Sequence, residues 1–154
     1  MEPRIDLLAP DSPAVDAVFA WHWREWSAGH EDPDPVEWRA RAAERTRADG
    51  IPFTLVAWLD DEPVGSIAVC HDDLDERYAD RGPWLSGVYV VGAARNLGVG
   101  RALLDAVCGR ARSFGVTELW LKTGEASAFY ERCGWTLVHR KESLTDDAVL
   151  MQSL

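Results

Sequence analysis

The stretch WLSGVYVVGAARNLGVGRALL, residues 84–104, decides the fold of this chain. Its first half is rich in β-branched and aromatic residues and predicts a strand, and its second half has the apolar spacing of an amphipathic helix. The turn between them carries Arg95, Gly98 and Gly100. Glycines let backbone N–H groups approach a ligand, and the first turn of a helix offers unpaired N–H donors with a partial positive charge. The stretch therefore predicts an anion site suited to a pyrophosphate.

Length and composition indicate a single globular domain, which we expect to span residues 1–154. Hydrophobic residues make up 47% of the chain and charged residues 27%, which argues against a disordered or a membrane protein. No window approaches the roughly 18 uninterrupted apolar residues of a membrane span, and the first residues lack the pattern of a signal peptide. We therefore expect a cytoplasmic protein.

The charge balance bears on the partners of the chain. The formal net charge of −10 disfavours a nucleic-acid backbone or an anionic membrane. An anionic cofactor must then be held locally, by backbone N–H groups and a few arginines, whereas a cationic amine would be attracted. The three cysteines, Cys70, Cys108 and Cys133, lie far apart and form no CxxC pair, so we expect neither a disulfide framework nor a metal site.

Hydrophobic periodicity and turn residues predict the remaining elements. We expect strands at residues 4–8, 53–59, 64–70, 84–91, 118–122, 135–140 and 148–154. We expect helices at about residues 13–26, 35–48, 98–113 and 126–132. The strand–helix–strand unit at residues 84–122 implies a parallel crossover among antiparallel neighbours. The predicted fold class is α/β (α+β), with a mixed, mostly antiparallel sheet of six to seven strands and helices on both faces.

Two other glycine-rich phosphate loops fit the turn poorly. A Walker loop ends in Gly-Lys-Ser/Thr, but here Gly100 is followed by Arg101. A dinucleotide-binding loop has a third glycine where this chain has Leu103. It also requires an acidic residue at the end of the next strand, whereas Glu118 stands at the beginning.

The sequence resembles the acetyl-CoA motif of the GNAT superfamily of N-acetyltransferases through the pattern Val88-x-Val90-x-x-x-x-Arg95-x-x-Gly98-x-Gly100-x-x-Leu103-Leu104. After that helix, the segment FYERCGW at residues 129–135 is similar to the superfamily's second signature, an aromatic-Tyr-Glu-x-x-Gly-aromatic run. Two motifs in the right order are far more specific than either one, and the order of the predicted elements matches over nearly the whole chain.

The resemblance implies how acetyl-CoA, the acyl donor, would bind. Backbone N–H groups of the glycine turn would hold the pyrophosphate, an arginine would add charge, and two valines would offer backbone groups to the pantetheine arm. These cofactor-binding residues are Val88, Val90, Arg95, Gly98, Val99, Gly100 and Arg101. The resemblance also implies a sheet splayed between its fourth and fifth strands, with the thioester in the gap and Tyr130 near its sulfur.

Acyl transfer to an amine requires a neutral amine and a stabilised leaving thiolate. A phenol with a pKa of about 10 suits a departing thiolate with a pKa near 8.5, so Tyr130 is the candidate catalytic acid. The alternative is a tyrosine whose ring packs beside Trp135 and whose hydroxyl is bonded to backbone. We expect a backbone N–H near Val90 to hold the oxyanion.

The general base stays unassigned. Many members of the superfamily carry a glutamate early in the fourth strand, where this chain has Trp84, Leu85 and Ser86. A water chain that relays the proton to bulk solvent is one alternative. The other is a side chain from a nearby loop, and the candidates are His71, Asp72, Asp73, Asp75, Glu76, Asp80 and Glu125.

We therefore expect an N-acetyltransferase that moves an acetyl group from acetyl-CoA to a primary amine, of a small molecule or a peptide, directly in a ternary complex. A non-catalytic acyl-CoA sensor is the alternative, which the absent strand carboxylate allows and Tyr130 argues against. An enzyme acting on aminoacyl-tRNA would need a basic face, which the net charge disfavours. The resemblance suggests a homodimer and places acceptor specificity in the first two helices and the loop before residue 84.

Overall fold

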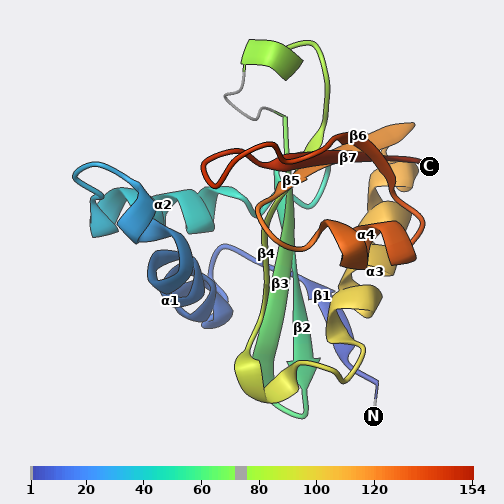
Figure 1. Cartoon of the computed structure of the whole chain (residues 1–154). Coiled ribbons are helices and arrows are strands. Elements are labelled where there is room, and N and C mark those ends of the chain that lie inside the picture. Colours follow the sequence, from blue (N-terminus) through green and yellow to red (C-terminus); the bar gives the residue numbers. More distant parts are fainter. Residues whose placement is uncertain (1, 72–75) are drawn as a thin grey trace.

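The computed structural model describes residues 2–71 and 76–154, and seven strands within them form one sheet (Figure 1). The strands are β1 (Arg4–Leu7), β2 (Phe53–Leu59), β3 (Glu62–Cys70), β4 (Trp84–Val90), β5 (Glu118–Thr123), β6 (Thr136–His139) and β7 (Ala148–Ser153). The helices are α1 (Ala14–Trp26), α2 (Pro35–Glu44), α3 (Val99–Ser113) and α4 (Ser127–Arg132), with short 3₁₀ helices at Ser27–Gly29, Glu76–Tyr78 and Gly92–Ala94.

The sheet is mixed and splayed at its centre. Its strand order is β1-β2-β3-β4-β5-β7-β6, and every neighbouring pair is antiparallel except β4 and β5. Those two strands run parallel and pair only where Trp84 lies opposite Trp120. There the backbone N–H of Trp120 donates to the carbonyl of Pro83 at 3.0 Å. Beyond that point they diverge. The structure thus confirms the predicted mixed sheet and the splay between the fourth and fifth strands.

Helices cover both faces of the sheet, as predicted. Figure 1 shows α1 and α2 on one side and α3 and α4 on the other. The larger apolar core packs Phe53, Ile67 and Leu103 between the sheet and α3, and a second core forms around Val15 and Val18 of α1. Because both faces are covered, the central strands β2 and β3 are buried nearly continuously instead of alternately.

An aromatic cluster closes the gap at the start of β4. Trp84 and Trp120 are buried with ring centroids 5.8 Å apart, and the ring of Tyr78 packs against both. The indole N–H of Trp84 donates to the carbonyl of Arg81 at 3.0 Å. This cluster fixes the single point where β4 and β5 meet, so the opening between them begins immediately afterwards.

Two predicted boundaries were wrong by two residues or more. The strand β3 begins at Glu62 and not at Val64, because Leu59 pairs with Glu62 across a turn in which Asp60 has a φ of 54°. The helix α2 ends at Glu44 and not near residue 48. Its capping residue Arg45 leaves helical geometry with a ψ of 54°, and the hydroxyl of Thr46 donates to the carbonyl of Ala43 at 2.7 Å.

Side-chain hydrogen bonds to backbone N–H groups lie at the starts of the first two helices. The Oδ1 of Asp34 accepts a hydrogen bond from the N–H of Val36 at 2.9 Å. The hydroxyl of Ser12 accepts from the N–H of Ala14 at 3.1 Å. None of the helices in the described part of the chain is both long and apolar enough to cross a membrane.

Candidate active site

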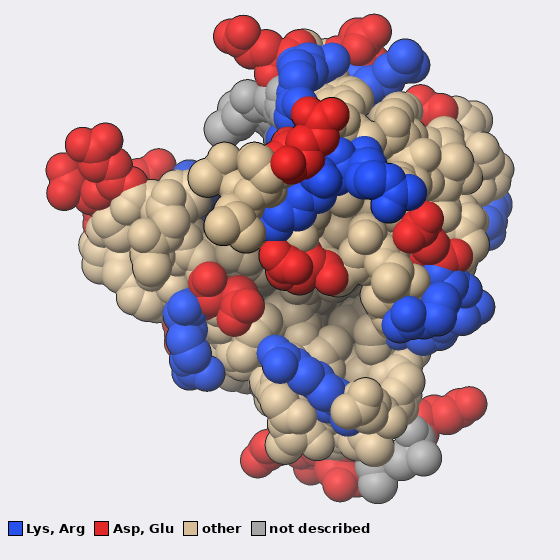
Figure 2. Space-filling view, in the orientation of Figure 1, with Lys and Arg blue, Asp and Glu red and all other residues tan. Residues whose placement is uncertain are grey.

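A cleft of about 950 Å³ opens where β4 and β5 diverge. Figure 2 shows the hollow at the centre of this face, with acidic and basic side chains around its rim. Its walls come from α1 and α2, from β4, from the stretch that runs from β5 into α4, and from the connection between β6 and β7. The lining residues used below are His22, Glu25, Trp26, Arg41, Arg45, Ser86, Gly87, Val88, Lys122, Glu125, Tyr130 and Asp147.

A bulge in β4 forms the floor of this cleft. Ser66 lies opposite Tyr89 and Ala68 opposite Ser86, so one residue of β3 faces two residues of β4, Gly87 and Val88. Gly87 has a φ of +59°, a conformation that residues with a Cβ rarely adopt. A Cβ there would also lie 2.5 Å from Cε1 of His22. Both the backbone angle and the neighbouring ring therefore require glycine.

The carbonyl of Gly87 is held by two side chains. The hydroxyl of Ser66 donates to it at 2.9 Å, and Nε2 of His22 lies 3.2 Å from it and 3.3 Å from the Ser66 oxygen. Since both of these neighbours act as acceptors, Nε2 carries the proton. Because a trans peptide points its C=O and N–H in opposite directions, the N–H of Val88 is directed away from Ser66 and His22.

His22 is neutral at physiological pH. The pKa of its imidazole is lowered to about 4, chiefly by burial and to a lesser extent by the nearby Arg45, whereas the hydrogen bond to Gly87 opposes this shift. A neutral imidazole with its proton on Nε2 is a hydrogen-bond donor to the bulge and carries no charge into the cleft. Its geometry therefore fits a positioning role for the β4 bulge.

Tyr130 reaches the cleft from α4. Its ring packs beside Trp135 with centroids 6.1 Å apart, as the alternative interpretation expected. The hydroxyl, however, forms no hydrogen bond with the described residues and is not among their fully buried polar atoms, so it opens toward the cleft. Burial of the ring raises the pKa of this phenol to about 12, so it keeps its proton throughout the neutral range.

The glycine turn forms an uncapped helix start. Gly98 is the N-cap of α3 with a φ of +81°, no side chain caps the helix, and its first turn contains no acidic residue. The N–H of Ala102 donates to the carbonyl of Gly98 at 3.0 Å, which leaves the N–H groups of Val99, Gly100 and Arg101 without intrahelical partners. This end of α3 therefore presents donors and a partial positive charge to an anion.

The two candidate arginines differ. Nε of Arg95 donates to the carbonyl of Val90 at 3.0 Å, so this side chain is fixed against the end of β4. Arg101 is exposed in the first turn of α3. A Cβ on Gly100 would lie 3.4 Å from Phe129, the residue before Tyr130. The start of α3 therefore lies close to α4, the helix that carries Tyr130.

The structure narrows the candidates for the base. His71, Glu76 and Asp80 are exposed and do not line the cleft, whereas Asp72, Asp73 and Asp75 lie outside the described residues. Glu125 does line the cleft, but it is exposed and accepts a hydrogen bond from Lys141 at 2.8 Å. That hydrogen bond lowers the pKa of Glu125, which weakens it as a base.

Local sequence patterns did not single out several residues of the cleft: Glu25, Arg45, Ser86, Lys122 and Asp147. They come from separate elements and carry no shared spacing. Of the tryptophans near the end of α1, Trp26 lines the cleft, whereas Trp21 stacks on Tyr89 in the core.

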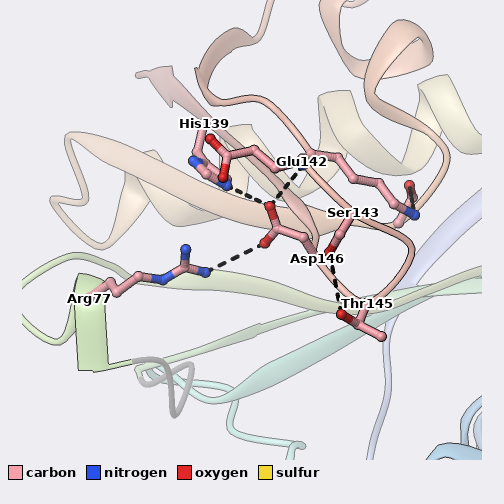
Figure 3. Close-up of polar contacts among 8 residues, drawn as sticks. Arg77, His139, Glu142, Ser143, Thr145 and Asp146 are labelled. Carbon is pink, nitrogen blue, oxygen red and sulfur yellow. Dashed lines mark hydrogen bonds and ion pairs between the residues drawn. The ribbon is translucent and has the colours of Figure 1, made fainter.

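A polar network fixes the loop that carries Asp147. Asp146 accepts from Nε2 of His139 at 2.8 Å and from the N–H of Glu142 at 3.0 Å, and it pairs with Arg77 at 3.8 Å (Figure 3). These contacts tie the β6–β7 connection to the segment before β4. The hydrogen bond from His139, followed by that from Glu142, lowers the pKa of Asp146 to about 2.

We expect Asp146→Asn to destabilise the protein at neutral pH but not in strong acid. A carboxyl group whose pKa is lowered on folding adds stability above its unfolded pKa of about 3.9, and that stability is lost as the pH falls toward 2. Urea midpoints measured from pH 7 to pH 3 should show the gap between wild type and variant narrowing below about pH 4. Asp61→Asn, in the exposed β2–β3 turn, is the control, and a gap independent of pH would contradict the assignment.

Comparisons with known proteins agree with this geometry. The model of the acetyltransferase (GNAT) family matches residues 15–135. Phosphinothricin N-acetyltransferase of Alcaligenes faecalis is 37% identical over 102 residues, which are 65% of this chain and 50% of that enzyme. The chain thus spans about half the length of this curated relative.

Solved structures share the fold at low sequence identity. The aminoglycoside 6'-N-acetyltransferase from Enterococcus faecium matches with a TM-score of 0.74 at 17% identity, over 97% of this chain and 96% of that one. The N-acetylglutamate synthase from Neisseria gonorrhoeae, complexed with coenzyme A and N-acetyl-glutamate, matches with a TM-score of 0.70 at 14% identity, over 100% of this chain and 36% of that one. The family model covers most of the chain and includes both sequence motifs, and on that ground this chain belongs to the acetyltransferase (GNAT) family.

Proposed function

We propose that this protein is an N-acetyltransferase that transfers the acetyl group of acetyl-CoA to a primary amine by direct attack in a ternary complex. The observation that carries the proposal is the opening between β4 and β5. The cleft there is lined by Tyr130, and the start of α3, with its unpaired N–H groups, lies close to Val90 of β4 and to Phe129, which precedes Tyr130. Family membership makes acetyl-CoA the expected donor.

The residues present fit the acyl donor. The N–H groups of Val99, Gly100 and Arg101 would hold the pyrophosphate, and Arg101 is placed to add charge. After Trp84, β4 has no strand partner on the side of β5. Its backbone groups there, including those of Val88, are available to an extended pantetheine arm as they would be to another strand.

Two groups on this chain would stabilise charge during transfer. The N–H of Val88, directed away from His22 by the bulge, would hold the oxyanion; this is two residues before the position expected from sequence. The hydroxyl of Tyr130 would donate a hydrogen bond to the departing sulfur. With a pKa of about 12 the phenol is a weaker acid than a thiol of pKa about 8.5, so Tyr130 stabilises the thiolate mainly through this hydrogen bond.

The acceptor would enter from the side of α1 and α2. Its ammonium form must lose a proton, and for a pKa of about 10.4 this costs about 4–5 kcal/mol at pH 7. Glu25 and Asp147 line the cleft and would attract the ammonium group. Water in the cleft would carry the proton to solvent. By their names, the relatives above act on phosphinothricin and aminoglycosides, and we propose an amine acceptor here as well.

The first test is a calorimetric titration with acetyl-CoA. Gly100→Glu should weaken binding at least about tenfold, because it places a negative charge beside the pyrophosphate and a side chain against Phe129. Gly109→Glu makes the same charge change in open space farther along α3 and should bind acetyl-CoA like the wild type.

Release of CoA with a panel of amines then separates an enzyme from an acyl-CoA sensor. An enzyme turns over at least one amine, whereas a sensor binds acetyl-CoA without amine-dependent release. If acetyl-CoA did not bind, both the enzyme and the sensor would be excluded. The single domain over residues 1–154, the cytoplasmic location and the homodimer stay predictions.

A further inference from the structure

Arg45 holds a particular position beside the proposed reaction centre. It caps the C-terminus of α2, it is partly buried, and its Nη1 donates to the hydroxyl of Ser86 at 3.2 Å. Ser86 directly precedes the bulge at Gly87. Both Arg45 and Ser86 line the cleft, so the guanidinium is held next to the floor on which the acyl group would lie.

The guanidinium of Arg45 has no acidic partner among the described residues. On the same helix, Arg39 pairs with Asp16 at 3.0 Å and Arg41 with Glu37 at 3.4 Å. The partner of Arg45 is instead a neutral hydroxyl, which uses one of the five donors of the group. A partly buried cation without a counter-charge is unfavourable, and a planar oxyanion would satisfy it with two parallel hydrogen bonds.

The charges around the cleft are arranged for a ligand with both signs. Arg41, Arg45 and Lys122 line it together with Glu25, Glu125 and Asp147, although the whole chain is strongly acidic. Arg45 lines the cleft together with His22, whose pKa it helps to lower. The acidic balance of the sequence predicted attraction of a cationic amine. The cleft itself also offers a cation.

We propose that the acceptor is an amine that also carries an oxyanion, such as the carboxylate of an amino acid, and that Arg45 binds this oxyanion while Ser86 orients the guanidinium. This inference rests on the proposed function and narrows it to a class of acceptor. Because the anchor adjoins the bulge, the amine and the oxyanion would be separated by only a few bonds.

The test compares amines that differ only in the carboxylate: L-lysine with cadaverine, L-phenylalanine with phenethylamine, and glycine with methylamine. Release of CoA gives kcat/KM for each, and the wild type should prefer at least one carboxylate-bearing member by roughly 10- to 100-fold over its matched amine, as expected for a charge-assisted ion pair. Arg45→Gln should abolish that preference by raising KM for the acid while leaving the matched amine unaffected. Arg45→Lys should retain part of it.

Arg39→Gln is the matched control, because it removes a guanidinium from the same helix at an exposed ion pair. Melting temperatures of all variants check that α2 remains folded. Equal kcat/KM for the two members of every pair would overturn the inference while leaving the acetyltransferase intact. Unchanged discrimination in Arg45→Gln would overturn it equally.

A second readout does not require turnover. The same pairs are titrated into protein saturated with CoA, and the acid should bind at least roughly tenfold more tightly than its matched amine in wild type but not in Arg45→Gln. Absence of turnover together with this binding difference would overturn the proposed function but would support the oxyanion site. Binding of neither member of any pair would overturn the oxyanion site itself.

Discussion

Replacing Tyr130 with phenylalanine should lower kcat by about 100-fold and leave the Kd for acetyl-CoA essentially unchanged. The substitution removes one oxygen from a ring that packs beside Trp135 and Phe129, so the packing of α4 is retained. That oxygen has no hydrogen-bond partner among the described residues, and its removal leaves no buried group unsatisfied. The decrease in kcat would therefore measure how much the hydroxyl stabilises the departing thiolate.

The measurement is steady-state release of CoA together with calorimetric titration of acetyl-CoA. A fall in kcat with unchanged Kd assigns the hydroxyl to the transition state, because groups used only there lower kcat without affecting ground-state binding. Tyr78→Phe is the control, since that ring packs in the aromatic cluster with Trp84 and Trp120. Wild-type kcat in Tyr130→Phe would show that the tyrosine acts only in packing.

Gly87→Ala should be the most damaging small substitution in the site. Its methyl group would lie 2.5 Å from Cε1 and 2.8 Å from Nε2 of His22, and the φ of +59° adds strain for any residue with a Cβ. Overpacking costs about 1–3 kcal/mol, and the left-handed conformation costs about 1–2 kcal/mol more. We therefore expect a loss of about 3 kcal/mol of unfolding free energy, measured by urea titration.

The same variant should lose acetyltransfer even where it stays folded. Any shift that relieves the clash must move His22 or the Gly87 carbonyl, and with it the N–H of Val88. Gly109→Ala is the control: it lies within α3, a Cβ there meets nothing within 4 Å, and the change should stabilise the helix by up to about 1 kcal/mol. A double variant that also carries His22→Ala should recover part of the stability. Wild-type activity in Gly87→Ala would show that the bulge does not position the reaction.

Much of the fold could be predicted because its signals are local. The glycine turn at residues 98–100, the apolar face of the following helix and the aromatic-Tyr-Glu segment at 129–135 each lie within a short window of sequence. Strand and helix periodicity then sufficed for the element order and for helices on both faces. Element ends were less predictable, because a single side-chain contact, such as Thr46 to the carbonyl of Ala43, ended α2 early.

The cleft could not be predicted in the same way. Arg45 meets Ser86 across 41 residues of sequence, and His22 meets Gly87 across 65. Neither pair has a spacing or residue type that marks it, since arginine on a surface helix and histidine on an apolar helix face are common. The bulge of β4 depends on register with β3, which is a property of two strands and of neither alone.

The sequence by itself determined the fold class, the helix start at residues 98–101 and the tyrosine segment, because backbone conformation and helix termini depend on neighbouring residues. Only the tertiary structure decided the charge and the shape of the cleft. Those depend on which side chains of α1, α2, β4, the stretch from β5 into α4 and the β6–β7 connection converge where β4 and β5 diverge. As a result, an acidic chain that was expected to attract a cation has an arginine in the lining of its cleft.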